Sequence, residues 1–289
     1  MKQDYLTRIN SFTIDNLPDI DEVVLGSLQF LSASDIPKLD SGLCDRPLVI
    51  GSDNAFLTGQ VIFNHRNAIF ADTANYKDKL QQMAGGIDGV YIISASGGKH
   101  AIEMVQEADK VKIPVFLITN NPKALAAQSL EDKNRLLFPR IREPYTYNTS
   151  TYLSMMLGAD DSLSAGKILE YMESTIQKIN FDVLSDRKAF TMILPLDFDI
   201  MKGLLVTKFD ELFGPELVGR AFSVEQIKHA KTVVRSNVEL FISFGVENEY
   251  YGEQECRLFV PLPDNCTPAG FLAIGYFVVG QIQKHYPSF

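Results

Sequence analysis

The sequence predicts an α/β protein with two domains, each built on a parallel β-sheet. The chain has 289 residues, which is enough for two small domains. Short apolar runs alternate with amphipathic segments along it, and the same plan begins again after a helical stretch near residues 150–180. Strands buried on both faces are continuous apolar runs joined by crossover helices, so this alternation indicates parallel sheets.

The first half is expected to hold a helical lead and one α/β domain. Residues 1–44 form the lead, which includes the stretch DIDEVVLGSLQFL, and residues 45–160 form the domain. Three segments of this domain read as a strand, a turn and a helix: LVIGSDNAFLTGQVIF, VYIISASGGKHAIEMVQEADKV and IPVFLITNNPKALAAQ. In the third segment the strand is predicted at Val115–Thr119 and the helix after Pro122. Each turn follows the carboxyl end of a predicted strand, which is where parallel sheets bind ligands.

The second half is expected to repeat the plan. A connecting helix is predicted over residues 161–186 and a second domain over residues 187–289. The predicted strands of this domain are AFTMILPL, VELFISFG and RLFVPLP, and its predicted helices are GLLVTKFDELF and GFLAIGYFVVGQIQKHY.

Composition and charge exclude several classes of protein. The chain is 46% hydrophobic and 22% charged, so it can bury a core and is not disordered. Its net charge of −9 argues against nucleic acid or a membrane surface as a partner, but not against a small anion bound at a local site. No run of eighteen apolar residues occurs, and the opening residues MKQD are not expected to start a signal peptide.

The cysteines point to a reducing compartment. Cys44, Cys256 and Cys266 are an odd set without a CxxC pair, so neither a disulfide framework nor a zinc site is expected. We therefore expect a cytoplasmic protein, with no metal and no organic cofactor.

The turn SASGGK has the composition of an anion site. Ser94 and Ser96 offer hydroxyl donors, and Lys99 offers a positive charge. Gly97 and Gly98 let the backbone approach a ligand closely, at the point where a helix presents unpaired amides. This chemistry is typical of phosphate binding. The alternative is that Ser96 caps the helix and the glycines only make the turn, and local composition does not decide between the two.

Four segments together resemble the sugar isomerase (SIS) domain family. SASGGK resembles the family's S-x-S-G-x-T phosphate loop, and LVIGSDNAFLTGQVI its first strand, turn and helix. IPVFLITNNP resembles the third strand, and REPYTYNTSTYLSMMLG the segment that leaves the domain. The resemblance implies two SIS-like doubly wound parallel-sheet domains, which are flavodoxin-like three-layer sandwiches.

The resemblance also implies roles for three further residues, with two departures from the family's pattern. Lys99 stands where the family has Thr, which keeps the affinity for anions but changes the geometry. Asp53 stands where a hydroxyl residue is usual, so we expect the turn with Ser52 and Asp53 to face sugar hydroxyls. Glu143 lies at the domain exit and is expected to line the site, or else to pair with Arg140 or Arg142.

The second half resembles the active-site stretch of double-domain SIS isomerases, K-L-K-E … E-L-K-H-G. In KFDELFGPELVGRAFSVEQIKHAKTVV this implies that Glu211 is the catalytic base and His229 the ring-opening group, with a spacing two residues longer than in the family. A histidine near neutral pKa suits ring opening, and a carboxylate suits proton transfer between neighbouring carbons. The alternatives are a solvated carboxylate on a helix surface and a histidine in an ordinary helix capped by Ser223.

The expected function is a phosphosugar isomerase that interconverts aldose and ketose forms of a hexose or amino-hexose phosphate. The alternatives are a fructosamine-phosphate-type deglycase or deaminase, and a regulator that binds a sugar phosphate without catalysis. VELFISFGVENEYYG lacks an SxSG loop, so we expect one phosphate site per chain. Lys284 is tempting as a tail lysine of the kind used by family members that handle amino sugars, but it falls in the last turn of a helix and is given no such role.

A homodimer with shared sites is also expected. The helix GFLAIGYFVVGQI is apolar on most of its surface. The family commonly completes a site across a two-fold interface, with His229 of one chain facing the SASGGK loop of the other. The alternative is that this helix is buried within its own chain.

Overall fold

The structure, a computed structural model, describes residues 4–230 and 236–287. The chain divides into two compact units, each with one sheet. The first-sheet unit consists of Ser34–Ile141 and Thr151–Asp161, and the second-sheet unit of Met1–Ala33, Arg142–Ser150 and Ser162–Phe289. Most of the N-terminal lead and most of the segment between the sheets thus belong to the second-sheet unit.

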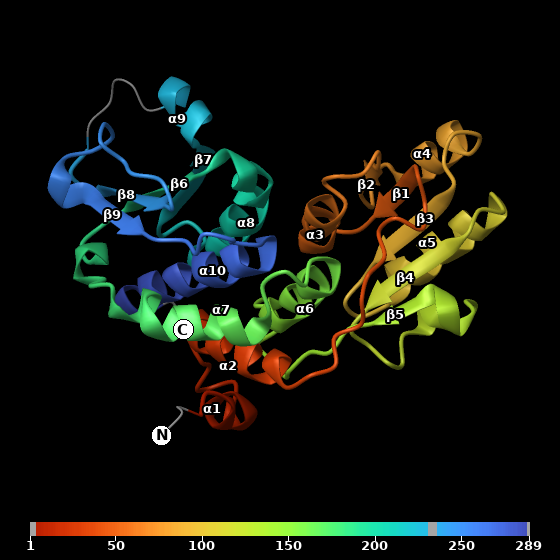
Figure 1. The fold of residues 1–289 in the computed structure, drawn as a ribbon, viewed down its shortest axis with the longest axis horizontal. Helices are drawn as coiled ribbons and strands as arrows, with labels where there is room; N and C mark the ends of the chain where they lie inside the picture. Colours follow the sequence, from red (N-terminus) through yellow and green to blue (C-terminus); the bar gives the residue numbers. More distant parts are fainter. Residues whose placement is uncertain (1–3, 231–235, 288–289) are drawn as a thin grey trace. The chain divides into compact units, whose positions relative to one another are not determined.

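The first-sheet unit holds five parallel strands in the order β2-β1-β3-β4-β5 (Figure 1). The strands are β1 (Pro47–Ile50), β2 (Ile69–Ala71), β3 (Gly89–Ile93), β4 (Val115–Thr119) and β5 (Arg135–Leu137). The helices are α3 (Asn54–Ile62), α4 (Tyr76–Met83), α5 (Lys99–Lys110) and α6 (Thr149–Ala159). Residues of α4 and α5 cover one face of the sheet, while Gly59 of α3 packs on Val49 and Ile93 of the other face. These are the three layers of a doubly wound sheet.

The second-sheet unit holds four parallel strands in the order β7-β6-β8-β9. The strands are β6 (Ala189–Leu194), β7 (Val218–Ser223), β8 (Glu239–Phe244) and β9 (Arg257–Val260). The helices are α1 (Leu6–Ser11), α2 (Ile20–Ser32), α7 (Ala165–Ser174), α8 (Lys202–Phe213), α9 (Val224–Ala230) and α10 (Pro268–His285). α9 packs on one face through Ile227, and α8 and α10 pack on the other through Phe209 and Phe271. The two parallel sheets with helices on both faces confirm the predicted fold class.

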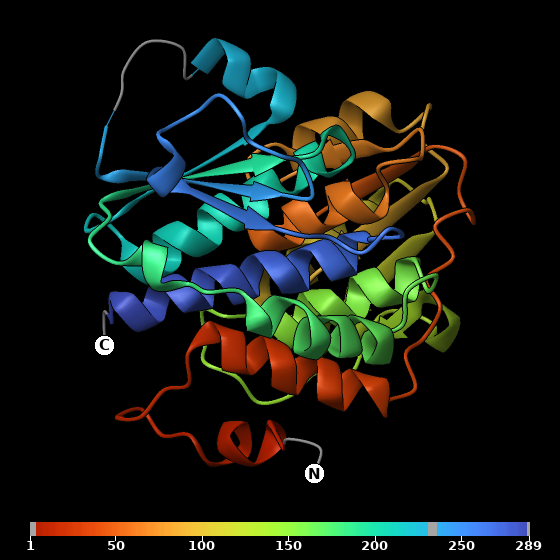
Figure 2. The same ribbon diagram turned by 60° about the vertical axis from the view of Figure 1, so that its left-hand side comes forward.

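α10 is buried within its own chain. Figure 2 shows it running past α2 and α7, and it also contacts α8. A Cβ atom on Gly280 would lie 2.4 Å from the backbone nitrogen of Asp21, and one on Gly275 would lie 2.6 Å from Leu205. Such close crossings need glycine, and they account for the apolar surface of this helix. The apolar character of α10 therefore gives no support to a dimer. Across the described part of the chain, no helix combines the length and the hydropathy that a bilayer span requires.

One predicted element is wrong and several were not predicted. The helix expected after Pro122 is only a 3₁₀ turn, Leu125–Ala127. The amide of Ala126 donates to the carbonyl of Gly97 at 3.2 Å, so this alanine-rich segment docks on the loop after β3 and does not extend as a helix. The short strands β2, β5 and β7 and the helix α4 had no strong apolar signal in the sequence.

Candidate functional site

The SASGGK loop connects β3 to α5 and is folded by its own serines. The amide of Gly97 donates to Ser94 Oγ at 3.2 Å, and the amide of Gly98 donates to Ser96 Oγ at 3.3 Å. Gly97 has φ +56°, and a Cβ atom there would lie 2.3 Å from the Cβ of Ala124. Only glycine fits this position. Because each serine oxygen accepts a bond, each hydroxyl keeps its proton for an outside acceptor.

The turn after β4 anchors this loop from the neighbouring strand. The amide of Asn120 and the hydroxyl of Thr119 both donate to the carbonyl of Ala95, each at 3.2 Å. The side-chain amide of Asn121 donates to the carbonyl of Ser96 at 2.8 Å. The carbonyls of Ala95 and Ser96, which would repel an anion, thus accept hydrogen bonds from the end of β4 and the turn after it. This anchoring was not predicted, although the T-N pair at the end of β4 is a sequence signal for it.

α5 begins directly after the loop. Its N-cap is Gly98, which provides no side-chain cap, so the interpretation of Ser96 as the helix cap is wrong. The first-turn amides of a helix have no intrahelical acceptor and attract anions. The exposed Lys99 stands at the first helical position. The loop therefore offers hydroxyl protons, helix amides and a positive charge together.

The turn after β1 ends at the same edge of the sheet. β1 pairs with β3 in parallel, with Ile50 opposite Ile92, so Ser52 and Asp53 follow β1 where Ser94 follows β3. Ser52 and Asp53 are both exposed. All seven predicted binding residues of the first-sheet unit thus gather on two neighbouring connections: Ser52, Asp53, Ser94, Ser96, Gly97, Gly98 and Lys99.

In the second-sheet unit, Glu143 and Glu211 both interact electrostatically with a buried lysine, Lys208. Lys208 precedes Glu211 by one turn of α8, forms an ion pair with it, and donates to the carbonyl of Thr146. The ammonium group lies 5.4 Å from the ring centroid of Tyr276. Lys208 is fully buried, whereas the Glu211 side chain is 26% exposed to solvent. Lys208 was not predicted from the sequence, because an i, i+3 pair on an amphipathic helix is normally a surface feature.

Burial shifts the pKa values of Lys208 and Glu143 in opposite directions. It lowers the pKa of Lys208 below its usual range, although Glu211 and Glu143 oppose the shift. It raises the pKa of Glu143, against hydrogen bonds from Ser150 and Thr149. Glu143 accepts from the Ser150 hydroxyl and the Thr149 amide, both at 2.6 Å. The carboxylate oxygens of Glu143 thus accept hydrogen bonds from the first residues of α6. Arg142, one of the two arginines expected as an alternative partner, lies over the ring of Phe12.

His229 is exposed near the end of α9. Ser223 Oγ accepts from the amide of Gln226 and the Gln226 side chain accepts from the amide of Ser223, each at 3.4 Å. This reciprocal pair is a capping box, so α9 begins as the capped-helix interpretation expected. The cap accounts for the helix and leaves the imidazole of His229 available to solvent.

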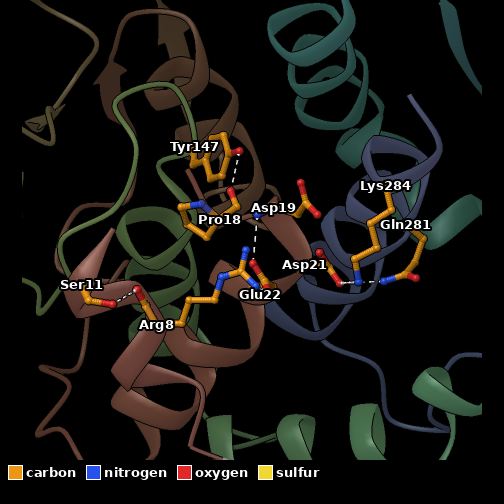
Figure 3. A network of polar contacts seen from close by, with 9 residues as sticks. All are labelled: Arg8, Ser11, Pro18, Asp19, Asp21, Glu22, Tyr147, Gln281 and Lys284. Carbon is orange, nitrogen blue, oxygen red and sulfur yellow. Dashed lines mark hydrogen bonds and ion pairs between the residues drawn. The ribbon is translucent and has the colours of Figure 1, made fainter. Parts of the chain in front are cut away.

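Lys284 is committed to a structural ion pair. Figure 3 shows it near the end of α10, reaching the carboxylate of Asp21 together with Gln281. Asp21 is almost fully buried, at 3% side-chain exposure, and a buried carboxylate needs such partners. A cleft of about 780 Å³ opens beside this network in the same unit. In the ranges 4–230 and 236–287, no group of histidine, cysteine and acidic residues is arranged to hold a metal.

Comparisons with known proteins identify the fold. No family model matches the sequence, and no curated protein matches it. Tagatose-6-phosphate ketose/aldose isomerase from Escherichia coli superposes with a TM-score of 0.60 at 12% identity, over 99% of this chain and 91% of that one. A Clostridium difficile protein inferred to be a phosphosugar isomerase gives a TM-score of 0.62 at 10% identity, over 92% and 93%.

The same fold occurs in the C-terminal domain of glucosamine-fructose-6-phosphate aminotransferase from Francisella tularensis. It superposes with a TM-score of 0.55 at 11% identity, over 94% of this chain and 97% of that domain. At such identities the likeness shows the fold and not the activity. The protein therefore has the double SIS fold, as the resemblance of its motifs implied.

Proposed function

We propose that the protein is a phosphosugar isomerase acting on a hexose or amino-hexose phosphate. The observation that carries the proposal is the SASGGK loop, which combines two serine hydroxyls, helix amides and Lys99 at the carboxyl edge of a parallel sheet. Its fold is that of proteins named as ketose/aldose isomerases. Sites of this type bind phosphate through charge-assisted hydrogen bonds.

Two residues of the second-sheet unit are proposed to carry the chemistry. Glu211 takes a proton from the carbon next to the carbonyl and returns it to the neighbouring carbon. His229 moves the proton that opens the cyclic sugar. The ion pair with Lys208 supports this role for Glu211, because it holds the carboxylate in a fixed position on α8. Glu143 is proposed to line the same site.

A panel of sugar phosphates tests the proposal. We expect a subset to raise the melting temperature and to be converted between aldose and ketose, while the unphosphorylated sugars do neither. Stabilisation without turnover would favour a sugar-phosphate sensor. Release of ammonia or of a free amine would favour a deaminase or deglycase. If no sugar phosphate binds, the proposal is wrong.

The resemblance further implies a homodimer in which His229 of one protomer serves the loop of its partner. Subunit exchange tests this part. A loop variant and a His229→Ala variant, each inactive alone, should recover partial activity when mixed, because some dimers then hold one intact site. Exchange without recovery would place the whole site in one chain.

A further inference from the structure

Asp53 holds an unusual backbone conformation at the edge of the first sheet. It stands at the N-cap of α3 with φ 43° and ψ −118°. Positive φ is rare for residues other than glycine, and strained positions of this kind are enriched at binding sites. The surrounding turn enforces it. A Cβ on Gly51 would lie 2.6 Å from the amide of Phe56, and the amide of Leu57 donates to the carbonyl of Asp53 at 3.0 Å.

The fold makes no use of the Asp53 carboxylate. Aspartate at an N-cap normally accepts an amide from the first turn, as Ser164 does for α7 and Thr267 does for α10. Asp53 makes no such bond, and its carboxylate has no hydrogen bond or ion pair within residues 4–230 and 236–287. The side chain is exposed. A residue that accepts backbone strain and gives up its capping bond has little structural reason to be an aspartate.

The carboxylate lies beside the phosphate loop proposed above. β1 and β3 are hydrogen-bonded neighbours, and their last paired residues are Ile50 and Ile92. Adjacent strands lie about 4.8 Å apart, so the Asp53 turn and the SASGGK loop fall within the length of one six-carbon sugar phosphate. One connection offers donors and a positive charge, and the other offers a fixed negative charge.

This arrangement selects among sugar phosphates by charge. A sugar phosphate whose sugar carries no amine would bring its phosphate dianion close to the Asp53 carboxylate. Only contacts of the sugar hydroxyls would offset the repulsion between these two groups. A protonated amine on the sugar would pair with Asp53 and cancel that repulsion. We propose that the ligand is an amine-bearing sugar phosphate and that Asp53 binds its ammonium group. The inference rests on the proposed phosphate site and specifies its substrate class.

Binding measurements with four probes test it: inorganic phosphate, glucosamine 6-phosphate, glucose 6-phosphate and N-acetylglucosamine 6-phosphate. The wild type should bind the amine-bearing probe at least about tenfold more tightly than the two uncharged analogues. Asp53→Asn keeps the size of the side chain and tolerates positive φ, but loses the charge. It should abolish the preference and leave the affinity for inorganic phosphate unchanged or slightly higher.

Asp186→Asn is the matched control, because Asp186 is also an exposed aspartate with positive φ, 60°, but belongs to the second-sheet unit. It should change none of the four affinities. If all the sugar phosphates bind alike, or if the preference survives in Asp53→Asn, the inference is wrong although the phosphate site stands. If even phosphate and the sugar phosphates fail to bind the wild type, the proposed function fails, and the inference fails with it.

Discussion

The connections after β3 and after β8 occupy equivalent places in the two sheets but differ in what they can bind. Each of these strands lies next to the first strand of its sheet, β1 or β6. After β3 the chain makes the SASGGK loop and starts the 12-residue helix α5. After β8 it turns at Gly245, with φ +64°, and reaches β9 through a single 3₁₀ turn, Gln254–Cys256.

The turn after β8 is filled by its own chain. Arg257 donates to the carbonyls of Asn248, Tyr251 and Gly252, so its guanidinium occupies the concave side of the turn. The turn ends without a helix whose first amides could meet an anion. The difference indicates that a strand end in a parallel sheet suits an anion only when a helix start and free donors follow it. It supports the proposal of one phosphate site per chain.

The largest expected effect separates catalysis in the second-sheet unit from binding in the first. Glu211→Gln keeps the shape of the side chain and loses the base, so turnover should fall by about two to four orders of magnitude with little loss of sugar-phosphate affinity. Steady-state kinetics and calorimetry measure the two effects. Asp210→Asn, the neighbouring exposed residue of α8, is the control and should keep full activity. A near-normal rate in Glu211→Gln would exclude it from the mechanism.

The next effect concerns the loop serines. Replacing Ser94 and Ser96 together by Ala should weaken sugar-phosphate binding by about 1–3 kcal/mol for each charge-assisted bond lost. Ser243→Ala, in the equivalent region of β8, should leave the affinity unchanged. Calorimetric titration decides. Equal affinities in the wild type and the double variant would mean that the serines only shape the turn.

Two glycine substitutions compare the turns after β3 and β8, and both should destabilise the protein to a similar extent. Gly97→Ala and Gly245→Ala each place a side chain at positive φ and against a neighbour, Ala124 in one case and Leu262 in the other. Each should lower the free energy of unfolding by about 1–3 kcal/mol. Only Gly97→Ala should also weaken phosphate binding, because only that loop is proposed to bind phosphate. Loss of binding in both variants would point to general unfolding and not to a local site.

The smallest effect is a pH dependence from Glu143. Burial raises the pKa of its carboxyl above the usual 4.5, so the folded protein keeps this proton where the unfolded chain has lost it. The contribution of Glu143 to stability is therefore fully present below pH 4.5 and is lost as the pH rises through the folded pKa. Relative to Glu143→Gln, the wild type should become less stable by about 1.4 kcal/mol for every pH unit between the unfolded and the folded pKa. Chemical denaturation at several pH values measures this, and a wild type that gains stability relative to Glu143→Gln as the pH rises would contradict it.

The sequence predicted the elements that carry a strong local signal. β4 was predicted with its observed ends, because VFLIT is an apolar run closed by a T-N turn. The SASGGK loop could be predicted as a candidate anion site because its serines, glycines and lysine lie within six consecutive residues. The anchoring of that loop by Asn121 and the burial of Lys208 could not be predicted, since both depend on contacts between segments distant in sequence. The strain at Asp53 was also invisible, because it follows from the packing around Gly51.

Proton exchange with solvent is the most direct test of the proposal that the protein isomerises a sugar phosphate through Glu211. The protein is incubated with the panel of sugar phosphates in deuterated water, and NMR follows both the aldose-to-ketose ratio and the deuterium at the carbons next to the carbonyl. The account predicts interconversion of at least one sugar phosphate with deuterium incorporation, which Glu211→Gln abolishes although the ligand still binds. Tight binding of a sugar phosphate with neither interconversion nor deuterium incorporation would contradict the account and leave a binding protein with the fold of an isomerase.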